Sequence, residues 1–153
     1  MKLDAYSDLA PENISILDFG AGNGRHSTAL RNRGYSVYSY DPYNGSEHAD
    51  PYSETSSVLP NETFDVVLSA FVLNVVSYEN MLDILRSMES YAKPDGYVVH
   101  IVREDLRNLR GGSKRGKHGS IQRDIPIKEL TDLGYSRVGK LFVKEGSWSV
   151  SVT

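Results

Sequence analysis

The stretch ILDFGAGNGRHSTALRNRGYSVYSYDP, residues 16–42, decides the fold of this chain. It joins a short apolar run, 14–19, to a helical pattern at 24–33 and then to a β-branched and aromatic run at 35–40. A strand that is apolar along its length is typical of a parallel sheet covered on both faces. The order strand, helix, strand therefore predicts a βαβ unit.

The alternation of strand and helix patterns continues along the chain. The run FDVVLSA at 64–70 predicts another buried strand, and apolar residues close to a 3.6-residue period predict a helix over 77–92. Residues 93–96, Lys-Pro-Asp-Gly, predict a turn, and YVVHIV at 97–102 predicts the next buried strand. These elements extend the βαβ unit into a larger layered sheet.

The last third of the chain predicts a change of pattern. A short helix is expected over 127–133, followed by two strands, 135–143 and 147–152, that flank a turn at 144–146. The fold class is therefore predicted as α/β, a three-layer sandwich whose mostly parallel twisted sheet ends in an antiparallel C-terminal hairpin. With 153 residues, the chain is expected to form a single domain over 1–153.

Finer features of these elements can be stated as well. The helix at 24–33 is expected to turn Ala29 and Leu30 inward and to end at Gly34. The polar segment 44–62 predicts mostly loop, with a very short strand at 48–50.

Composition and charge exclude several classes of protein. The chain has 39% apolar and 24% charged residues, and 17 basic against 20 acidic side chains give a formal net charge of -3. This balance lacks the positive field of a general nucleic-acid or membrane binder. Zero cysteines remove disulfides, thiolate zinc sites and cysteine nucleophiles, and the four histidines have no metal-ligand spacing, so no metal is expected. The apolar runs are too short to span a bilayer, and a cytoplasmic location is predicted.

The glycines after the first strand carry the chemistry. Gly20, Gly22 and Gly24 stand at alternate positions where a strand hands over to a helix, the place where open α/β sheets bind ligands. Glycine permits positive φ there and lets a ligand approach the backbone closely. Asp41 ends the next strand, where an acid can accept both hydroxyls of a ribose. A nicotinamide dinucleotide is disfavoured, because Arg25 stands where its fingerprint places a third small residue.

Three motifs in this order resemble the class I S-adenosylmethionine-dependent methyltransferases. ILDFGAGNGRHSTALRNRGYSVYSYDP at 16–42 is similar to that family's first two strands and intervening helix, and FDVVLSAFVLNVV at 64–76 is similar to its fourth strand and following loop. KPDGYVVHIV at 93–102 resembles the turn and fifth strand. The resemblance implies a Rossmann-like methyltransferase fold, S-adenosylmethionine as cofactor and methyl transfer as the activity.

The resemblance also implies which residues form the site. Asp18 would lie near the amino end of the cofactor, the glycine loop along its amino-acid part, Asp41 at the ribose and Asp50 near the adenine, with Phe71 over the cofactor. The complete implied cofactor-binding set is Asp18, Phe19, Gly20, Ala21, Gly22, Asn23, Gly24, Asp41, Pro42, Asp50, Ser69, Ala70 and Phe71.

Asn74 is the one residue that the resemblance places on the catalytic, acceptor-facing side. It is a polar exception in an apolar run, and burying it unpaired would be costly. A structural hydrogen bond that caps the next helix explains it equally well. Methyl transfer from a sulfonium needs mainly an in-line approach of the acceptor, so a general base is optional.

The acceptor is left open by the sequence. A small-molecule substrate is expected, and the segment 103–123, with seven basic and two acidic residues, allows a nucleic-acid methyltransferase as an alternative. A second alternative is a cofactor-binding module without turnover that acts with a partner. Because little chain precedes the first strand, either a small accessible substrate, a partner chain or self-association in a homo-oligomer is expected to supply the substrate specificity.

Overall fold

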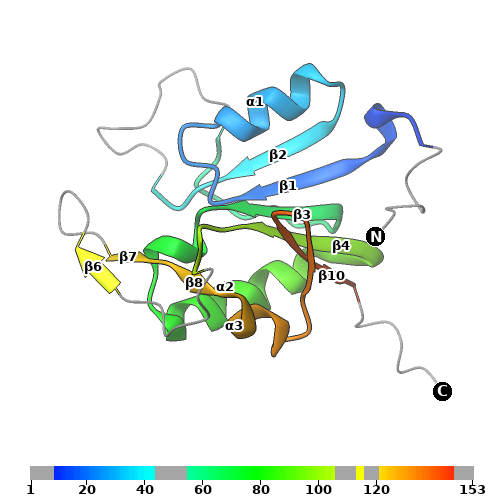
Figure 1. Cartoon of the computed structure of the whole chain (residues 1–153). Coiled ribbons are helices and arrows are strands. Elements are labelled where there is room, and N and C mark those ends of the chain that lie inside the picture. The colour runs from blue at the N-terminus through cyan, green and yellow to red at the C-terminus, as the bar shows by residue number, and fades with distance from the viewer. Residues whose placement is uncertain (1–8, 44–54, 106–112, 116–120, 147–153) are drawn as a thin grey trace.

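The computed structural model describes residues 9–43, 55–105, 113–115 and 121–146, and Figure 1 shows the whole chain. A short 3-10 turn, η2 (Pro11–Asn13), precedes the first strand, and a second, η3 (Leu73–Val75), follows β3. The helices are α1 (Arg25–Asn32), α2 (Tyr78–Tyr91) and α3 (Ile127–Thr131). The strands of the main sheet are β1 (Ser15–Phe19), β2 (Ser36–Tyr40), β3 (Phe64–Ala70), β4 (Ala92–Ile101), β9 (Ser136–Val138) and β10 (Leu141–Glu145).

The main sheet has six strands in the order β2-β1-β3-β4-β10-β9. β2, β1, β3 and β4 run parallel, whereas β10 pairs antiparallel with both β4 and β9. The order reverses between β1 and β3, which is the switch point where open sheets bind ligands at the carboxyl ends of their strands. The mixed α/β architecture predicted from the sequence is confirmed.

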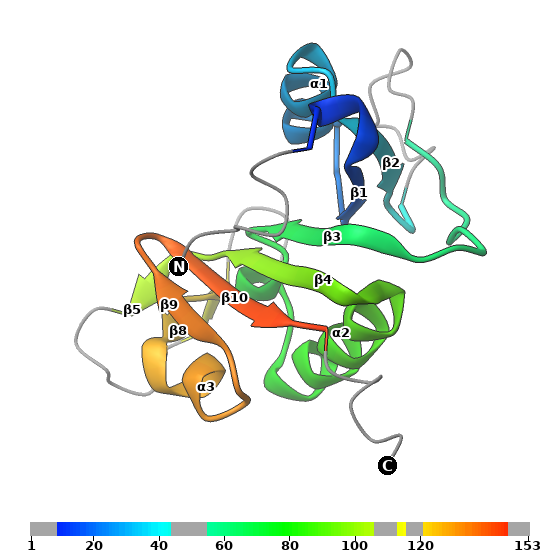
Figure 2. The same cartoon turned by 90° about the vertical axis from the view of Figure 1, so that its right-hand side faces the viewer.

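The three layers are visible in Figures 1 and 2. α1 covers one face of the sheet, and α2 and α3 cover the other. The core lies mainly beneath α2 and α3, where Met81, Leu85 and Met88 of α2 and Leu130 of α3 are buried against the sheet. Burial on both faces explains why β1 is mostly apolar, with Asp18 as its buried acid.

Two smaller pairs of strands lie outside the main sheet. β5 (Glu104–Asp105) pairs parallel with β8 (Ile125–Pro126), and β6 (Ser113–Arg115) pairs antiparallel with β7 (Ile121–Arg123). The basic segment 103–123 therefore contains strands in its described parts. β7 contacts η3 and so lies beside the end of β3.

The expected turn at 93–96 is wrong. β4 is continuous from Ala92, and its register on β3 shifts between the pairs Phe64↔Ala92 and Val66↔Tyr97. The extra residues form an irregularity within the strand, which the extended backbone preferred by proline and by the residue before it allows.

The position of the C-terminal hairpin also differs from the prediction. Its turn lies at Gly139 and Lys140 between β9 and β10, and Lys144 and Glu145, expected in the turn, belong to β10. Gly139 has a φ of 61°, which suits a tight turn. The strand expected at 147–152 lies outside the described residues.

Helix α1 presents a different face from the one expected. Ser27 is its buried residue, while Ala29 is exposed and Leu30 is half-buried. Ser27 is drawn inward by a hydrogen bond to Asp18 of β1, which outweighs the apolar character of Ala29. Gly34 ends the helix with a φ of 95°, as expected.

Two other sequence features can be compared with the structure. The strand expected at 48–50 lies outside the described residues, and Ser56 instead forms a parallel bridge to Tyr40. Within the described ranges, no helix is long and apolar enough to cross a membrane.

Candidate cofactor site

The glycine loop between β1 and α1 is held in a conformation that requires glycine. Gly20, Gly22 and Gly24 have φ angles of 80°, 59° and 82°. The N–H groups of Gly20 and Ala21 both donate to the carbonyl of Tyr40 at 2.8 Å, which fastens the loop to the end of β2. A Cβ placed on Gly22 would meet no heavy atom within 4 Å, so the middle of the loop faces open space. A ligand can therefore lie directly on its backbone.

Asp41 lies across from this loop at the end of β2. Its Oδ2 accepts from the N–H of Gly22 at 2.9 Å, and its Oδ1 accepts from the N–H of Tyr43 at 2.8 Å. Each carboxylate oxygen has a second lone-pair site, so the group can accept two further hydroxyl donors. The two backbone bonds fix the carboxylate beside the glycine loop before any ligand binds.

Asp18 is the buried acid of the site, with only 1% of its surface exposed. The Ser27 hydroxyl donates to its Oδ2 at 2.6 Å, Ser39 donates to Ser27 at 2.6 Å, and the Arg31 guanidinium donates to Ser39 at 2.9 Å. Burial raises the pKa of the Asp18 carboxyl above its usual range, against the opposing effect of the Ser27 hydrogen bond. A cation placed beside this carboxylate would offset the cost of its burial.

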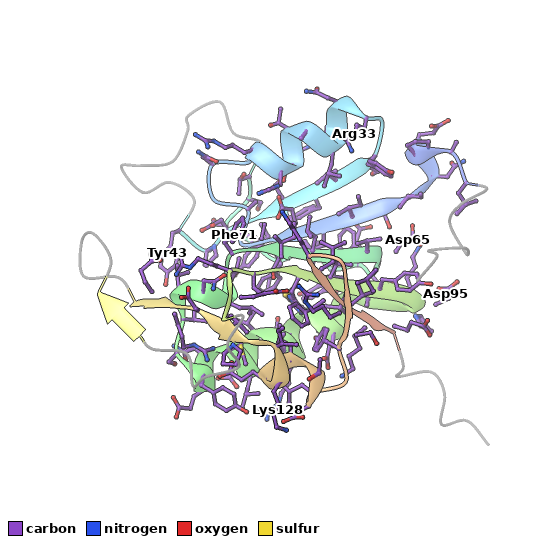
Figure 3. All side chains as sticks on the ribbon, in the orientation of Figure 1. Arg33, Tyr43, Asp65, Phe71, Asp95 and Lys128 are labelled. Carbon is purple, nitrogen blue, oxygen red and sulfur yellow. The ribbon has the colours of Figure 1, made fainter. Side chains whose placement is uncertain are left out.

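The segment that follows β3 packs on the glycine loop. A Cβ placed on Gly20 would lie 2.5 Å from Cγ2 of Val72, so Val72 lies directly against that glycine. Phe71 has a φ of 61°, an unusual value for a bulky residue, and its ring is 49% exposed. In Figure 3, Phe71 and Tyr43 lie at one end of the sheet, and Asp65 and Asp95 lie at the other. Strained backbone of this kind clusters at ligand sites.

Asn74 is buried in η3, with 2% of its surface exposed. Its Nδ2 donates to the carbonyls of Arg103 at 2.9 Å and Arg123 at 2.6 Å, and its Oδ1 accepts from the N–H of Arg103 at 2.8 Å. Helix α2 is capped instead by Ser77, whose hydroxyl accepts from the N–H of Asn80 at 3.2 Å. The helix-capping alternative for Asn74 is therefore wrong: the side chain joins backbone segments and does not cap the helix.

Ser69 and His100 form a buried pair on neighbouring strands. The Ser69 hydroxyl lies 2.7 Å from Nδ1 of His100, and both residues are fully buried. Burial lowers the pKa of His100 to about 3, so the ring is neutral. Nε2 of His100 has no hydrogen-bond partner in the described part of the chain. The ring edge packs on Tyr135 instead, with centroids 4.8 Å apart.

The other residues of the implied cofactor set lie as follows. Phe19 is buried and packs on Tyr40 with ring centroids 5.1 Å apart, whereas Asn23 and Pro42 are exposed and Ala70 is half-buried. Asp50 lies outside the described residues. The structure thus brings the glycine loop, Asp18, Asp41 and the end of β3 together.

Sequence reasoning missed Ser27, Ser39 and Val72, which support this site. Ser27 and Ser39 connect Asp18 to Arg31, and Val72 fills the space in front of Gly20. The one available signal was a serine on the inward side of a helix that directly follows the glycines. Nothing in the sequence pairs Val72 with Gly20, because that contact depends on the tertiary fold.

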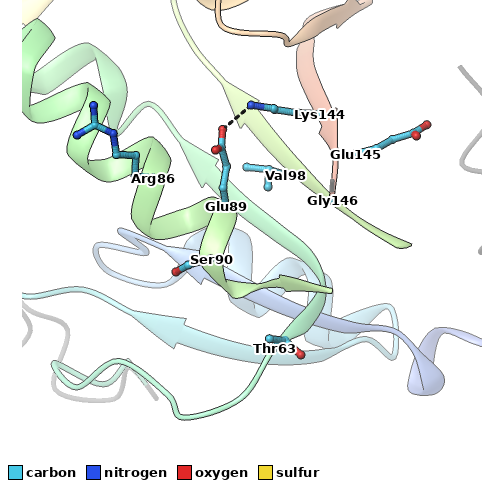
Figure 4. Close-up of a pocket in the computed structure, with 8 residues that line it drawn as sticks. All are labelled: Thr63, Arg86, Glu89, Ser90, Val98, Lys144, Glu145 and Gly146. Atoms are coloured by element: carbon cyan, nitrogen blue, oxygen red, sulfur yellow. Dashed lines mark hydrogen bonds and ion pairs between the residues drawn. The ribbon is translucent and has the colours of Figure 1, made fainter. Parts of the chain in front are cut away.

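A separate pocket of about 530 Å³ lies between α2, β4 and the end of β10, as Figure 4 shows. Glu89 accepts from Lys144 at 3.0 Å and from the hydroxyl of Tyr135 at 2.8 Å. Glu89 and Lys144 of the pocket lining therefore satisfy each other, and none of the glycine-loop residues lines the pocket. Among the described residues, no three His, Cys, Asp or Glu side chains are grouped to hold a metal ion.

Comparisons with known proteins bear on the family and the fold of the chain. A family model described as a methyltransferase domain matches residues 2–132. Phosphoethanolamine N-methyltransferase 3 of Arabidopsis thaliana is 26% identical over 119 residues, which cover 68% of this chain and 24% of that protein. The chain thus spans about a quarter of the length of this curated relative.

Solved structures share the fold at low sequence identity. The Burkholderia thailandensis 1,6-didemethyltoxoflavin-N1-methyltransferase, solved with S-adenosylhomocysteine, matches with a TM-score of 0.67 and 18% identity, over 92% of this chain and 80% of that one. The magnesium protoporphyrin IX methyltransferase of Synechocystis was solved with bound S-adenosylmethionine. It matches with a TM-score of 0.58 and 19% identity, over 92% of this chain and 73% of that one.

Proposed function

Because this chain belongs to the methyltransferase domain family, whose model matches residues 2–132, we propose that it binds S-adenosylmethionine and methylates a small-molecule acceptor. The observation that carries the proposal is Asp41, whose carboxylate is bonded across to Gly22 of a positive-φ glycine loop. The structural relatives named above support the same cofactor and small acceptors, as their descriptions state.

The residues of the site fit this cofactor. The open side of Gly22 leaves room for an extended ligand along the loop, and the free acceptor sites of Asp41 suit the two ribose hydroxyls. The buried carboxylate of Asp18 suits the positive amino group of the amino-acid part. Phe71, half exposed at the end of β3, offers a ring face that favours a cationic sulfonium.

The chain's own contribution to the reaction is binding and alignment. Bound S-adenosylmethionine supplies an activated methyl group on a sulfonium. Asp41 holds the ribose and Asp18 the amino-acid end of the ligand, and the segment after β3 limits the direction from which an acceptor can approach. Holding two reactants in line removes much of the entropic part of a barrier, so no general base is required. The expectation that Asn74 faces the acceptor stays a prediction.

Substitution of Asp41 by alanine is expected to weaken binding of S-adenosylmethionine by about 1.5 to 3 kcal/mol, roughly 10- to 150-fold, because a charged acceptor is lost. Calorimetric titration measures this directly. Asp83→Ala on the exposed face of α2 is the matched control and should leave the affinity unchanged. Equal affinities of wild type and Asp41→Ala would refute the ribose assignment.

Parallel titrations with S-adenosylmethionine, S-adenosylhomocysteine and NAD test the function itself. Binding of the first two without NAD supports the proposal, and NAD binding alone would overturn it. Release of S-adenosylhomocysteine in the presence of candidate small acceptors then separates an enzyme from a module without turnover. Self-association and the cytoplasmic location stay predictions.

A nucleic-acid acceptor is less well supported by the described part of the basic segment. Arg103 pairs with Asp124, and Arg123 is buried and bonded to Glu129 at 2.6 Å, so these two cations are neutralised within the fold. We expect binding to duplex DNA to be weak at 150 mM salt, because Arg103 and Arg123 are already paired and only other cations could contact the phosphates. Tight binding in a fluorescence titration that falls steeply with added salt would favour the nucleic-acid alternative.

A further inference from the structure

The glycine loop and η3 are joined by direct contact. Val72 lies against Gly20, and its carbonyl accepts from the N–H of Val75 at 3.2 Å, which closes the 3-10 turn. Asn74 lies within that turn, two residues beyond Val72. A single tight turn thus carries one residue that contacts the cofactor loop and one that faces away into the protein. Because a closed turn moves as a unit, a displacement at Val72 reaches Asn74.

Asn74 is bonded to the two ends of the segment that connects β4 to α3, where the chain leaves the main sheet and returns to α3. We call these two ends together the stem and define it as residues 103–104 and 122–125. The two sides of the stem are bonded to each other, since the N–H of Ile125 donates to the carbonyl of Arg103 at 2.9 Å and Glu104 pairs with Ile125 in the β5·β8 ladder. An ion pair between Arg103 and Asp124 adds a side-chain link. The two sides of the stem are therefore held together by backbone and side-chain links.

Asn74 contacts both sides of the stem at once. Its carboxamide accepts one hydrogen bond and donates two, all to backbone groups of Arg103 and Arg123. Both amide hydrogens and the carbonyl oxygen are used, so the side chain has no remaining donor for a substrate. A buried amide with every donor satisfied this way fixes geometry strongly, because any displacement leaves a polar group unpaired.

We propose that the stem borders the acceptor and that Asn74 is a positioning residue, which links the glycine loop to the stem and thereby sets where the stem lies relative to that loop. This inference rests on the proposed function. In-line transfer needs the acceptor to be placed against the methyl group. The segment that borders the acceptor must therefore be held in a fixed position relative to the glycine loop. Asn74 holds the stem in that position through its three hydrogen bonds to backbone groups.

Backbone hydrogen exchange with and without S-adenosylhomocysteine tests the link, because it needs no acceptor. In wild type, the ligand should slow exchange in the glycine loop and in the stem. In Asn74→Ala, the affinity for S-adenosylhomocysteine should stay within about 3-fold, whereas stem exchange without ligand should rise at least about 10-fold. The ligand should then protect only the glycine loop. Asn80→Ala, an exposed asparagine in the first turn of α2, is the matched control and should behave as wild type.

The outcomes separate this inference from the proposed function. No binding of S-adenosylhomocysteine by wild type would overturn both. If wild type binds S-adenosylhomocysteine but the ligand does not slow exchange in the stem, the link is overturned and the proposed function stands. The same holds if the ligand protects the stem equally in wild type and in Asn74→Ala. Loss of stem protection in the variant with retained ligand binding would support the link.

Asn74→Asp keeps the test decisive if the alanine variant does not fold. An ionised carboxylate accepts from the N–H of Arg103 but repels the two carbonyls, whereas the protonated acid can donate to one of them. The charged neighbours are already paired, Arg103 with Asp124 and Arg123 with Glu129. Stem protection relative to wild type should therefore recover between pH 8 and pH 5 in this variant only. A difference that does not change with pH would overturn the role of the two donor bonds.

Discussion

Substitution of Gly20 by alanine is expected to destabilise the fold by about 2 to 5 kcal/mol and to abolish cofactor binding. Two costs act together. The φ of 80° strains any residue with a Cβ, and the new atom would lie 2.5 Å from Cγ2 of Val72. Val72 is β-branched and has little rotameric freedom with which to move away. Denaturant unfolding measures the stability, and calorimetric titration with S-adenosylhomocysteine measures the binding.

Gly22→Ala is the matched control for this prediction. Gly22 also has a positive φ, 59°, but open space surrounds the position of its missing Cβ. Only the backbone strain remains, so a loss of about 1 to 2 kcal/mol is expected. If Gly20→Ala and Gly22→Ala cost the same, Val72 does not pack on the loop as described.

The protein is expected to lose about 2 to 3 kcal/mol of stability between pH 6.5 and pH 4.5 through His100 alone. Burial lowers the pKa of this residue from 6.5 to about 3 in the folded state. Between these values the unfolded chain binds a proton that the native protein excludes. The contribution is therefore fully present above pH 6.5 and is lost as the pH falls toward 3, at up to about 1.4 kcal/mol per pH unit.

Urea unfolding of wild type and His100→Gln across this pH range isolates the effect. Glutamine does not titrate and can keep a hydrogen bond to Ser69, so the variant should lack the added slope even if it is less stable at pH 7. Burial raises the pKa of Asp18, so its linkage has the opposite sign, but it is present in both proteins and cancels in the difference. Parallel pH profiles of the two proteins would show that His100 is not buried in neutral form.

Much of the fold follows from local pattern. β3 was predicted with its observed bounds, Phe64–Ala70, and the helix expected over 77–92 is α2 with Ser77 as its N-cap. Apolar runs and helical periods are local signals, so the elements they predict do not depend on which other segments the chain packs against. The turn expected at 93–96 failed because β4 already begins at Ala92 and contains those residues as an irregularity between the pairs Phe64↔Ala92 and Val66↔Tyr97. The hairpin turn failed because Gly139, not Gly146, sets its register.

The sequence by itself determined the glycine loop that we propose holds the cofactor. Three glycines at alternate positions and an acid at the end of the next strand are local requirements of backbone conformation and ligand chemistry, which leave a visible pattern. Only the tertiary structure decided the surroundings: Val72 against Gly20, Ser27 beneath Asp18, and Asn74 between the two sides of the stem. Some of these contacts join residues far apart in the chain. Others use small polar side chains, such as serine, whose presence in a sequence does not indicate one particular role. Their partners are fixed by packing and by the need to satisfy buried polar groups, which no local pattern records.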